Sequence, residues 1–273
     1  KAASIKIVIA GASAFSVPTV KRLNDLDYQI AAVLTQPDRA AGRGLKQTKN
    51  PVKLFAEKAE LTVLDFESLD GENVFETIKK LSPDLLITIA YGGLIPQKIL
   101  DIPRCESINI HPSLLPLWRG ASPIQSAILN GDTKTGISLI RMTPELDAGP
   151  IFAVTETSID PEENTLTLSN RLANMSATLM TDKIEDIVNK NTFPNEQEHQ
   201  KATYASKLTK QDAIINWTRP ASEILKKIKA FNPWPVAHSI LEQKNFRIWD
   251  AKLSKQINDI SKPGSIVKTQ SNE

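Results

Sequence analysis

Apolar runs of strand length alternate with amphipathic helical patterns along the first 110 residues. The apolar runs lie at 4–10, 30–34, 61–64, 85–89 and 105–110, and the helical patterns at 17–26, 51–59 and 73–81. The run at 85–89 is the most continuously apolar, as is typical of a parallel strand covered on both faces. This alternation predicts an α/β fold with a doubly wound, mostly parallel sheet, whose ligands bind beyond the carboxyl ends of the strands.

The pattern changes after Pro150. A strand at 151–157 and a long helix at 165–189 lead into a polar, proline-containing stretch at 191–207. Beyond it we expect a helix at 221–231 and alternating strands at 237–242, 246–253 and 265–268, with Trp217, Trp234 and Trp249 in their core. We therefore predict a first domain at 1–190, a linker at 191–207 and a small C-terminal β-barrel domain of the OB-like kind at 208–273.

The composition is that of an ordinary globular protein. Hydrophobic residues make up 41% and charged residues 23% of the chain, which excludes the disordered and fibrous classes. No apolar run approaches the ~20 residues that span a bilayer, and the N-terminus does not resemble a signal peptide. Cys105, the single cysteine, has no partner for an internal disulfide, and we interpret it as a reduced packing residue of a cytoplasmic protein.

Charge is unevenly distributed along the chain. Residues 208–273 contain 11 Lys and Arg against 6 Asp and Glu, a net charge of +5, whereas residues 1–207 contain 22 against 25, a net charge of −3. A basic C-terminal portion permits a polyanion to lie across the protein, although basic faces are usually only solvated.

Common nucleotide-binding and hydrolytic motifs are absent from the sequence. The turn at Gly11-Ala12-Ser13 follows the first strand but lacks the G-x-G-x-x-G pattern, so we predict no NAD site there. The P-loop, H-E-x-x-H, paired C-x-x-C and G-x-S-x-G motifs are also absent. Their absence excludes the commonest nucleotide, zinc and α/β-hydrolase sites, and we predict no metal site.

Three polar residues in the central stretch 107–150 have complementary chemistry. Asn109 and His111 share one face at the end of the strand at 105–110, and Asp147 follows in Asp147-Ala148-Gly149-Pro150. Taken singly, His111 is more often a structural residue and Asp147 a turn residue. Together they suit acyl transfer, in which Asn109 and His111 stabilise an oxyanion while Asp147 holds and charges the imidazole.

The same stretch resembles a known superfamily. Asn109-Ile110-His111-Pro112-Ser113-Leu114-Leu115-Pro116, its continuation Trp118-Arg119-Gly120-Ala121-Ser122-Pro123, and Leu146-Asp147-Ala148-Gly149-Pro150 are similar to the core of the folate-dependent formyltransferases. The resemblance implies a Rossmann-like formyltransferase fold, 10-formyltetrahydrofolate as co-substrate and no metal. It leaves the acceptor of the formyl group open.

Two further stretches resemble the methionyl-tRNA formyltransferases within that superfamily. Residues 35–44, which lead to Pro51-Val52-Lys53, look like their inserted loop, and residues 204–208, 215–217 and 231–235 look like their linker and C-terminal domain. The implied partners are initiator methionyl-tRNA and 10-formyltetrahydrofolate, with no membrane partner. The resemblance also implies that the protein is a monomer. Because the barrel of that family continues through further strands, we expect the C-terminal domain to be incomplete at Glu273.

The resemblance also implies roles for individual residues. It assigns catalysis to Asn109, His111 and Asp147. Tetrahydrofolate binding is implied for Ser113, Leu114, Leu115 and Pro116, and for Tyr91, Gly92 and Leu94 in a wall of the folate pocket. Contact with the aminoacyl end or the tRNA is implied for Phe15, Arg39, Arg43, Lys46 and Lys49.

Two other functions remain open at this point. One is formyl transfer to a sugar nucleotide or another small amine, because the aminoarabinose formyltransferases share the C-terminal type of domain. They do not share the loop between Gln36 and Lys53, which therefore favours methionyl-tRNA. This loop is basic, with Asp38 as its single acid against Arg39, Arg43, Lys46, Lys49 and Lys53. The other is a non-catalytic folate-binding or RNA-binding protein. The presence of all three residues of the trio argues against this second alternative.

Overall fold

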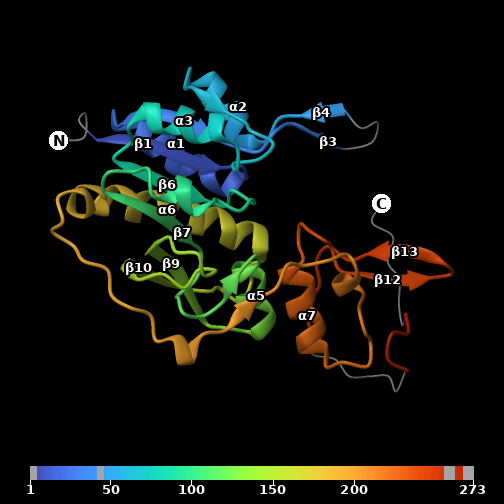
Figure 1. Cartoon of the computed structure of the whole chain (residues 1–273). Helices are drawn as coiled ribbons and strands as arrows, with labels where there is room; N and C mark the ends of the chain where they lie inside the picture. Colours follow the sequence, from blue (N-terminus) through green and yellow to red (C-terminus); the bar gives the residue numbers. More distant parts are fainter. Residues whose placement is uncertain (1–4, 42–45, 255–261, 267–273) are drawn as a thin grey trace.

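A seven-stranded sheet forms the centre of the protein. The computed structural model describes residues 5–41, 46–254 and 262–266 (Figure 1). The sheet has the order β10-β9-β7-β6-β1-β2-β5. Strands β7, β6, β1, β2 and β5 are parallel, while β9 runs antiparallel to both of its neighbours. The strands are β1 (Lys6–Gly11), β2 (Gln29–Leu34), β5 (Val63–Leu64), β6 (Leu85–Ile89), β7 (Glu106–His111), β9 (Lys134–Arg141) and β10 (Ile151–Ser158). The predicted doubly wound, mostly parallel sheet is confirmed.

Helices cover both faces of this sheet and bury one apolar cluster under each. One cluster lies beneath α1 (Val17–Asp25), α2 (Pro51–Lys58), α5 (Pro123–Asn130) and α6 (Thr165–Val188). The other lies beneath α3 (Glu72–Leu81) and α4 (Gln97–Leu100). Every residue of β6 is buried, in agreement with its continuous apolar run.

Side-chain caps fix the starts of two helices. At α2 the Asn50 side chain accepts hydrogen bonds from the backbone N–H groups of Val52 and Lys53, and Pro51 occupies the first turn. At α6, Asn164 and Thr167 form a reciprocal capping box. Capping satisfies backbone donors that have no partner inside the helix, so it sets where each helix begins.

The segment between β2 and α2 contains a hairpin of β3 (Arg39–Ala41) and β4 (Lys46–Thr48). In Figure 1 the hairpin projects away from the sheet. Its base is tied to the body by Lys53, whose Nζ lies 2.8 Å from Asp38 Oδ1 and 2.6 Å from Asp65 Oδ2. These two hydrogen bonds, with Asp38 contributing more, raise the pKa of Lys53.

The C-terminal part contains α7 (Ala221–Ala230) and a hairpin of β12 (His238–Leu241) and β13 (Lys244–Arg247). The prediction of a strand at 246–253 is wrong beyond Arg247. Of the strand predicted at 265–268, residues 265–266 are not in a strand, and residues 267–268 lie outside the described residues. Trp217 packs against the local apolar cluster, but Trp234 and Trp249 are about half exposed. Within the described residues this part contains one α-helix, a 3-10 turn at Gln211–Ala213 and one hairpin, so the predicted barrel stays a prediction.

The stretch at 191–207 connects these parts and is more ordered than its composition indicates. Asn195 forms a bridge with Ile151 of β10, and a 3-10 turn at His199–Lys201 follows. Strand β11 (Tyr204–Ala205) then pairs with β8 (Arg119–Gly120). Among the described residues, no helix has the length and apolar character needed to cross a membrane.

Candidate active site

The candidate site lies at the carboxyl end of β7, between β6 and β9. Ile108 and Ile110 of β7 belong to the cluster beneath α6, so the intervening Asn109 points to the opposite face, as does His111 at the strand end. Doubly wound sheets bind their ligands at these strand ends.

Asp147 joins Asn109 and His111 from the loop between β9 and β10. Asn109 Nδ2 donates to Asp147 Oδ1 at 3.1 Å, and the backbone N–H of Gly120 donates to Oδ2 at 2.8 Å. His111 Nδ1 lies 3.6 Å from Oδ2, within ion-pair distance, and the His111 and Asp147 side chains are only 5% and 11% exposed. The structure thus brings the three residues of the predicted trio together around the largely buried carboxylate of Asp147.

The contacts of His111 determine which ring nitrogen carries a proton. Nε2 lies 2.9 Å from the carbonyl oxygen of Trp118, and a carbonyl oxygen only accepts, so Nε2 is the donor. The imidazole is therefore held between a backbone carbonyl and the Asp147 carboxylate. Asn109 has a second amide hydrogen beyond the one given to Asp147, and a ligand oxygen can accept it.

Strained backbone lies beside the trio. Ala90 after β6, Trp118 before β8 and Asp147 after β9 have φ angles of 44°, 61° and 49°. Positive φ is uncommon in residues other than glycine and costs about 1–3 kcal/mol at each position. Such strain is often found at functional sites, but positive φ angles also occur away from the trio, for example at Ser82 and Val236, so they accompany the site without identifying it.

Two buried residues that the sequence analysis did not single out support the Asp147 loop. Gln197 is 5% exposed and Arg119 is 4% exposed. Gln197 Nε2 donates to the carbonyl oxygens of Asp147 at 2.9 Å and Gly149 at 2.7 Å, while the guanidinium of Arg119 donates to Gln197 Oε1. The polar composition of residues 191–207 indicated solvent exposure, so only a long-range contact could have revealed Gln197.

The residues predicted to bind folate lie in two loops near the trio. In the loop after β7, Ser113 is fully buried and its hydroxyl donates to the carbonyl oxygen of Leu117, so that hydroxyl is engaged within the turn. Leu115 is also buried, whereas Leu114 and Pro116 are partly buried. In the loop after β6, Tyr91 is buried while Gly92 and Leu94 are exposed, Leu94 by 88%. Their role in folate binding stays a prediction.

Of the residues predicted to contact the aminoacyl end or the tRNA, Phe15, Arg39 and Lys49 are described, and their contacts are with residues other than the trio. Phe15 is buried in the cluster beneath α1 and α6. Arg39 is exposed and its guanidinium donates to Gln36 Oε1, whereas Lys49 is paired with Glu57 at 2.7 Å. Arg43 and the side chain of Lys46 lie outside the described residues.

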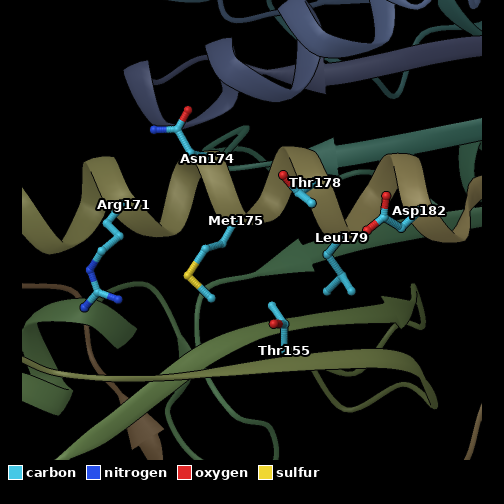
Figure 2. Close-up of a pocket in the computed structure, with 7 residues that line it drawn as sticks. All are labelled: Thr155, Arg171, Asn174, Met175, Thr178, Leu179 and Asp182. Carbon is cyan, nitrogen blue, oxygen red and sulfur yellow. The ribbon is translucent and has the colours of Figure 1, made fainter.

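Two hollows differ in their relation to the trio. A cleft of about 30 Å³ has Asn109 and Asp147 in its wall, together with Arg141 at the end of β9 and with Thr143 and Glu145 of the β9–β10 connection. A larger cavity of about 390 Å³ lies between α6 and β10, where Figure 2 shows Met175 and Leu179 pointing from the helix towards Thr155. The larger cavity contains no residue of the trio, so the smaller cleft is the candidate site.

Two other kinds of chemistry gain no support from the described residues. Burial raises the pKa of the Cys105 thiol, with a smaller contribution from Asp84, and this disfavours a reactive thiolate. No group of three or more His, Cys, Asp and Glu side chains in the described part of the chain is arranged to hold a metal ion. The absence of a metal requirement stays a prediction.

Comparison with known proteins gives consistent matches. A family model described as formyl transferase matches residues 4–184, and one described as formyl transferase, C-terminal domain, matches residues 207–273. A methionyl-tRNA formyltransferase of Methylococcus capsulatus is 40% identical over 268 residues, which cover 98% of this chain and 87% of that protein. Two solved structures share the fold. A 4-N formyltransferase from Francisella tularensis has a TM-score of 0.72 at 19% identity, covering 93% of this chain and 100% of that one. HypX from Aquifex aeolicus in complex with tetrahydrofolic acid has a TM-score of 0.69 at 16% identity, covering 96% of this chain and 40% of that one.

Proposed function

This chain belongs to the methionyl-tRNA formyltransferase family of the formyl transferases, and we propose that it transfers the formyl group of 10-formyltetrahydrofolate to the α-amine of methionyl initiator tRNA. The observation that carries the proposal is the partly buried cluster of Asn109, His111 and Asp147, which suits acyl transfer, in a chain similar to such enzymes over nearly its whole length. A folate co-substrate is supported by the family and by the structural neighbour that binds tetrahydrofolic acid.

The reaction joins two substrates and needs no side-chain nucleophile. The methionyl α-amine attacks the formyl carbon, the formyl oxygen becomes an oxyanion, and the bond from that carbon to the folate nitrogen then breaks. The amine loses one proton overall, and the folate nitrogen gains one. Because an α-amine with a pKa near ~8 must be neutral to attack, the reaction depends on prior loss of its proton.

In this mechanism Asn109, His111 and Asp147 stabilise the oxyanion. Asn109 donates its second amide hydrogen to the formyl oxygen, while its first stays on Asp147. His111 donates to the Trp118 carbonyl in the present conformation, so its part in binding the oxyanion requires the ring to turn from that carbonyl. Asp147, whose Oδ2 lies 3.6 Å from His111 Nδ1, favours the positively charged form of the imidazole, which is the stronger donor to the oxyanion.

Binding of the two substrates is assigned to the surrounding loops. The folate lies against the loop of Ser113 to Pro116 and the loop of Tyr91 to Leu94. The β3–β4 hairpin, with Arg39, Arg43, Lys46 and Lys49, and the basic residues beyond 207 contact the tRNA, so affinity falls steeply with salt. Phe15 lies near the aminoacyl end. The protein acts as a monomer in the cytoplasm, without a metal or a membrane partner, and divides into domains at about residues 190 and 208.

The test is formylation of initiator methionyl-tRNA with 10-formyltetrahydrofolate. We expect the native protein to formylate this tRNA and not an amino-sugar nucleotide. Asn109→Ala and His111→Ala should each lower kcat by about 10²–10³-fold, as expected for loss of an oxyanion donor. Asn174→Ala, a change at an exposed asparagine on α6, is the control and should leave kcat unchanged. Formylation of the sugar alone would overturn the acceptor, and full activity of both site variants would overturn the mechanism.

A further inference from the structure

The segment predicted to be a linker runs along the candidate active site. The backbone N–H of Trp118 donates to Thr203 Oγ1 at 2.9 Å, and the backbone N–H of Arg119 donates to the Thr203 carbonyl at 2.9 Å. Together with the β8–β11 pairing, these bonds attach the segment to the loop that supplies the Trp118 carbonyl to His111. Residues 185–206 lie outside both family models, although they touch the site.

Within this segment Gln197 has every hydrogen-bonding position filled. An amide side chain has two hydrogens and two acceptor positions. The two hydrogens of Gln197 go to the carbonyl oxygens of Asp147 and Gly149, and its oxygen accepts from Nε and Nη2 of Arg119 at 3.1 and 2.7 Å. Because a guanidinium only donates, this arrangement also fixes which way the amide of Gln197 faces.

The two carbonyl groups held by Gln197 flank the strained turn of the site. Asp147 has a φ of 49°, a conformation that persists only when surrounding contacts enforce it. The side chain of that same residue contacts Asn109, His111 and the N–H of Gly120. A bond to the Asp147 main chain therefore controls where its carboxylate lies relative to the other two members of the trio.

We propose that Gln197 is a positioning residue of the active site, which holds the Asp147–Gly149 turn so that the Asp147 carboxylate meets Asn109 and His111 at once. Arg119 contributes indirectly, because its guanidinium orients the Gln197 amide. The inference deepens the proposed formyl transfer and rests on it, but the position of Asp147 can also be measured without catalysis.

Kinetics separate a positioning role from a general contribution to stability. Gln197→Ala should lower kcat by about 10- to 100-fold with little change in KM for either substrate, because a misplacement near 1 Å costs up to about 10²-fold. In an Asp147→Asn background the same change should have almost no effect, because the group it positions is already lost. An equal loss in both backgrounds, or a change in KM alone, would overturn the inference.

Two further variants identify the contact that matters. Gln197→Glu keeps an acceptor for Arg119 but cannot donate to the two carbonyl oxygens, so it should lose as much kcat as Gln197→Ala. Retention of kcat would show that Gln197 serves Arg119 instead and would refute the proposal. Gln200→Ala changes an exposed glutamine three residues away and should behave as the native protein.

Hydrogen exchange at the Gly120 amide provides a measurement that does not depend on activity. This N–H donates to Asp147 Oδ2, so it should be protected in the native protein and in Gln200→Ala, and exchange faster in Gln197→Ala. Unchanged protection in Gln197→Ala would contradict the inference. If the native protein were inactive but the Gly120 amide still exchanged faster in Gln197→Ala, the proposed function would be refuted and the positioning role would be retained.

Discussion

Replacing Gly120 with alanine should damage both the stability and the activity of this protein. Gly120 has a φ of 114°, which residues other than glycine rarely adopt, and a Cβ built on it would lie 2.7 Å from the carbonyl oxygen of Ala205. That oxygen also accepts the hydrogen bond from the N–H of Ala121 at 2.9 Å. The strands β8 and β11 therefore cannot keep their present distance once the methyl group is added.

The cost of Gly120→Ala has two parts. Holding alanine at this backbone conformation costs about 1–3 kcal/mol. Movement of β8 also breaks the bond from the Gly120 N–H to the Asp147 carboxylate, and a hydrogen bond to a charged group contributes about 1.5–3 kcal/mol. We therefore expect the free energy of unfolding to fall by about 2.5–6 kcal/mol. Displacement of Asp147 should also lower kcat by about 10²-fold.

Gly131→Ala is the matched control for urea unfolding and formylation kinetics. Gly131 has a φ of 79°, but an added Cβ would meet only the flexible end of Lys226, at 3.1 Å. The control should cost about 1–2 kcal/mol, from backbone strain alone, and leave kcat unchanged. If Gly120→Ala were no more destabilising than Gly131→Ala, or kept its kcat, the close approach of β8 and β11 would not matter as argued.

Two further predictions concern stability. The pKa of Lys53 is raised by Asp38 and Asp65, so the contribution of this residue to stability is complete below pH 10.5 and is lost as the pH rises further. Above this pH the melting temperature should fall more steeply in the native protein than in Lys53→Met, with Lys58→Met as an exposed control. Equal slopes would contradict the assignment. Thr19 Oγ1 is buried without a partner among the described residues, so Thr19→Val should raise the free energy of unfolding by about 1 kcal/mol. Thr165→Val removes a hydrogen bond to the Ala230 carbonyl oxygen and should lower the free energy of unfolding. A loss of stability in Thr19→Val would refute this reasoning.

The parts of the fold that follow from local patterns could be predicted from the sequence. Strand β6 matches its apolar run at Leu85–Ile89, because a strand buried on both faces needs every position to be apolar. Asn109 and His111 could be assigned to one face because alternation along a strand is a local property. Their meeting with Asp147 followed from the resemblance and from the general location of ligand sites in such sheets.

The features that depend on distant partners could not be predicted. Lys53 ends the basic loop in sequence, which indicates a cation free to contact a ligand, but Asp65 approaches it from beyond α2 and pairs with it together with Asp38. Gln197 lies in a polar stretch whose composition favours solvent exposure, and its burial depends on Arg119, 78 residues earlier. Trp234 and Trp249 were expected in a core because aromatic residues usually are, but only Trp217 packs against the local cluster.

The path of the segment before β11 determines how this protein can be dissected. A fragment cut at residue 190 would lose Gln197, Thr203 and Ala205, which together hold the loops of Asp147 and Trp118. The shortest fragment that retains the complete site therefore ends after Ala205. Chimeras that exchange C-terminal portions between relatives should be joined downstream of that residue, since a junction placed earlier would combine one enzyme's catalytic loops with another's supporting segment.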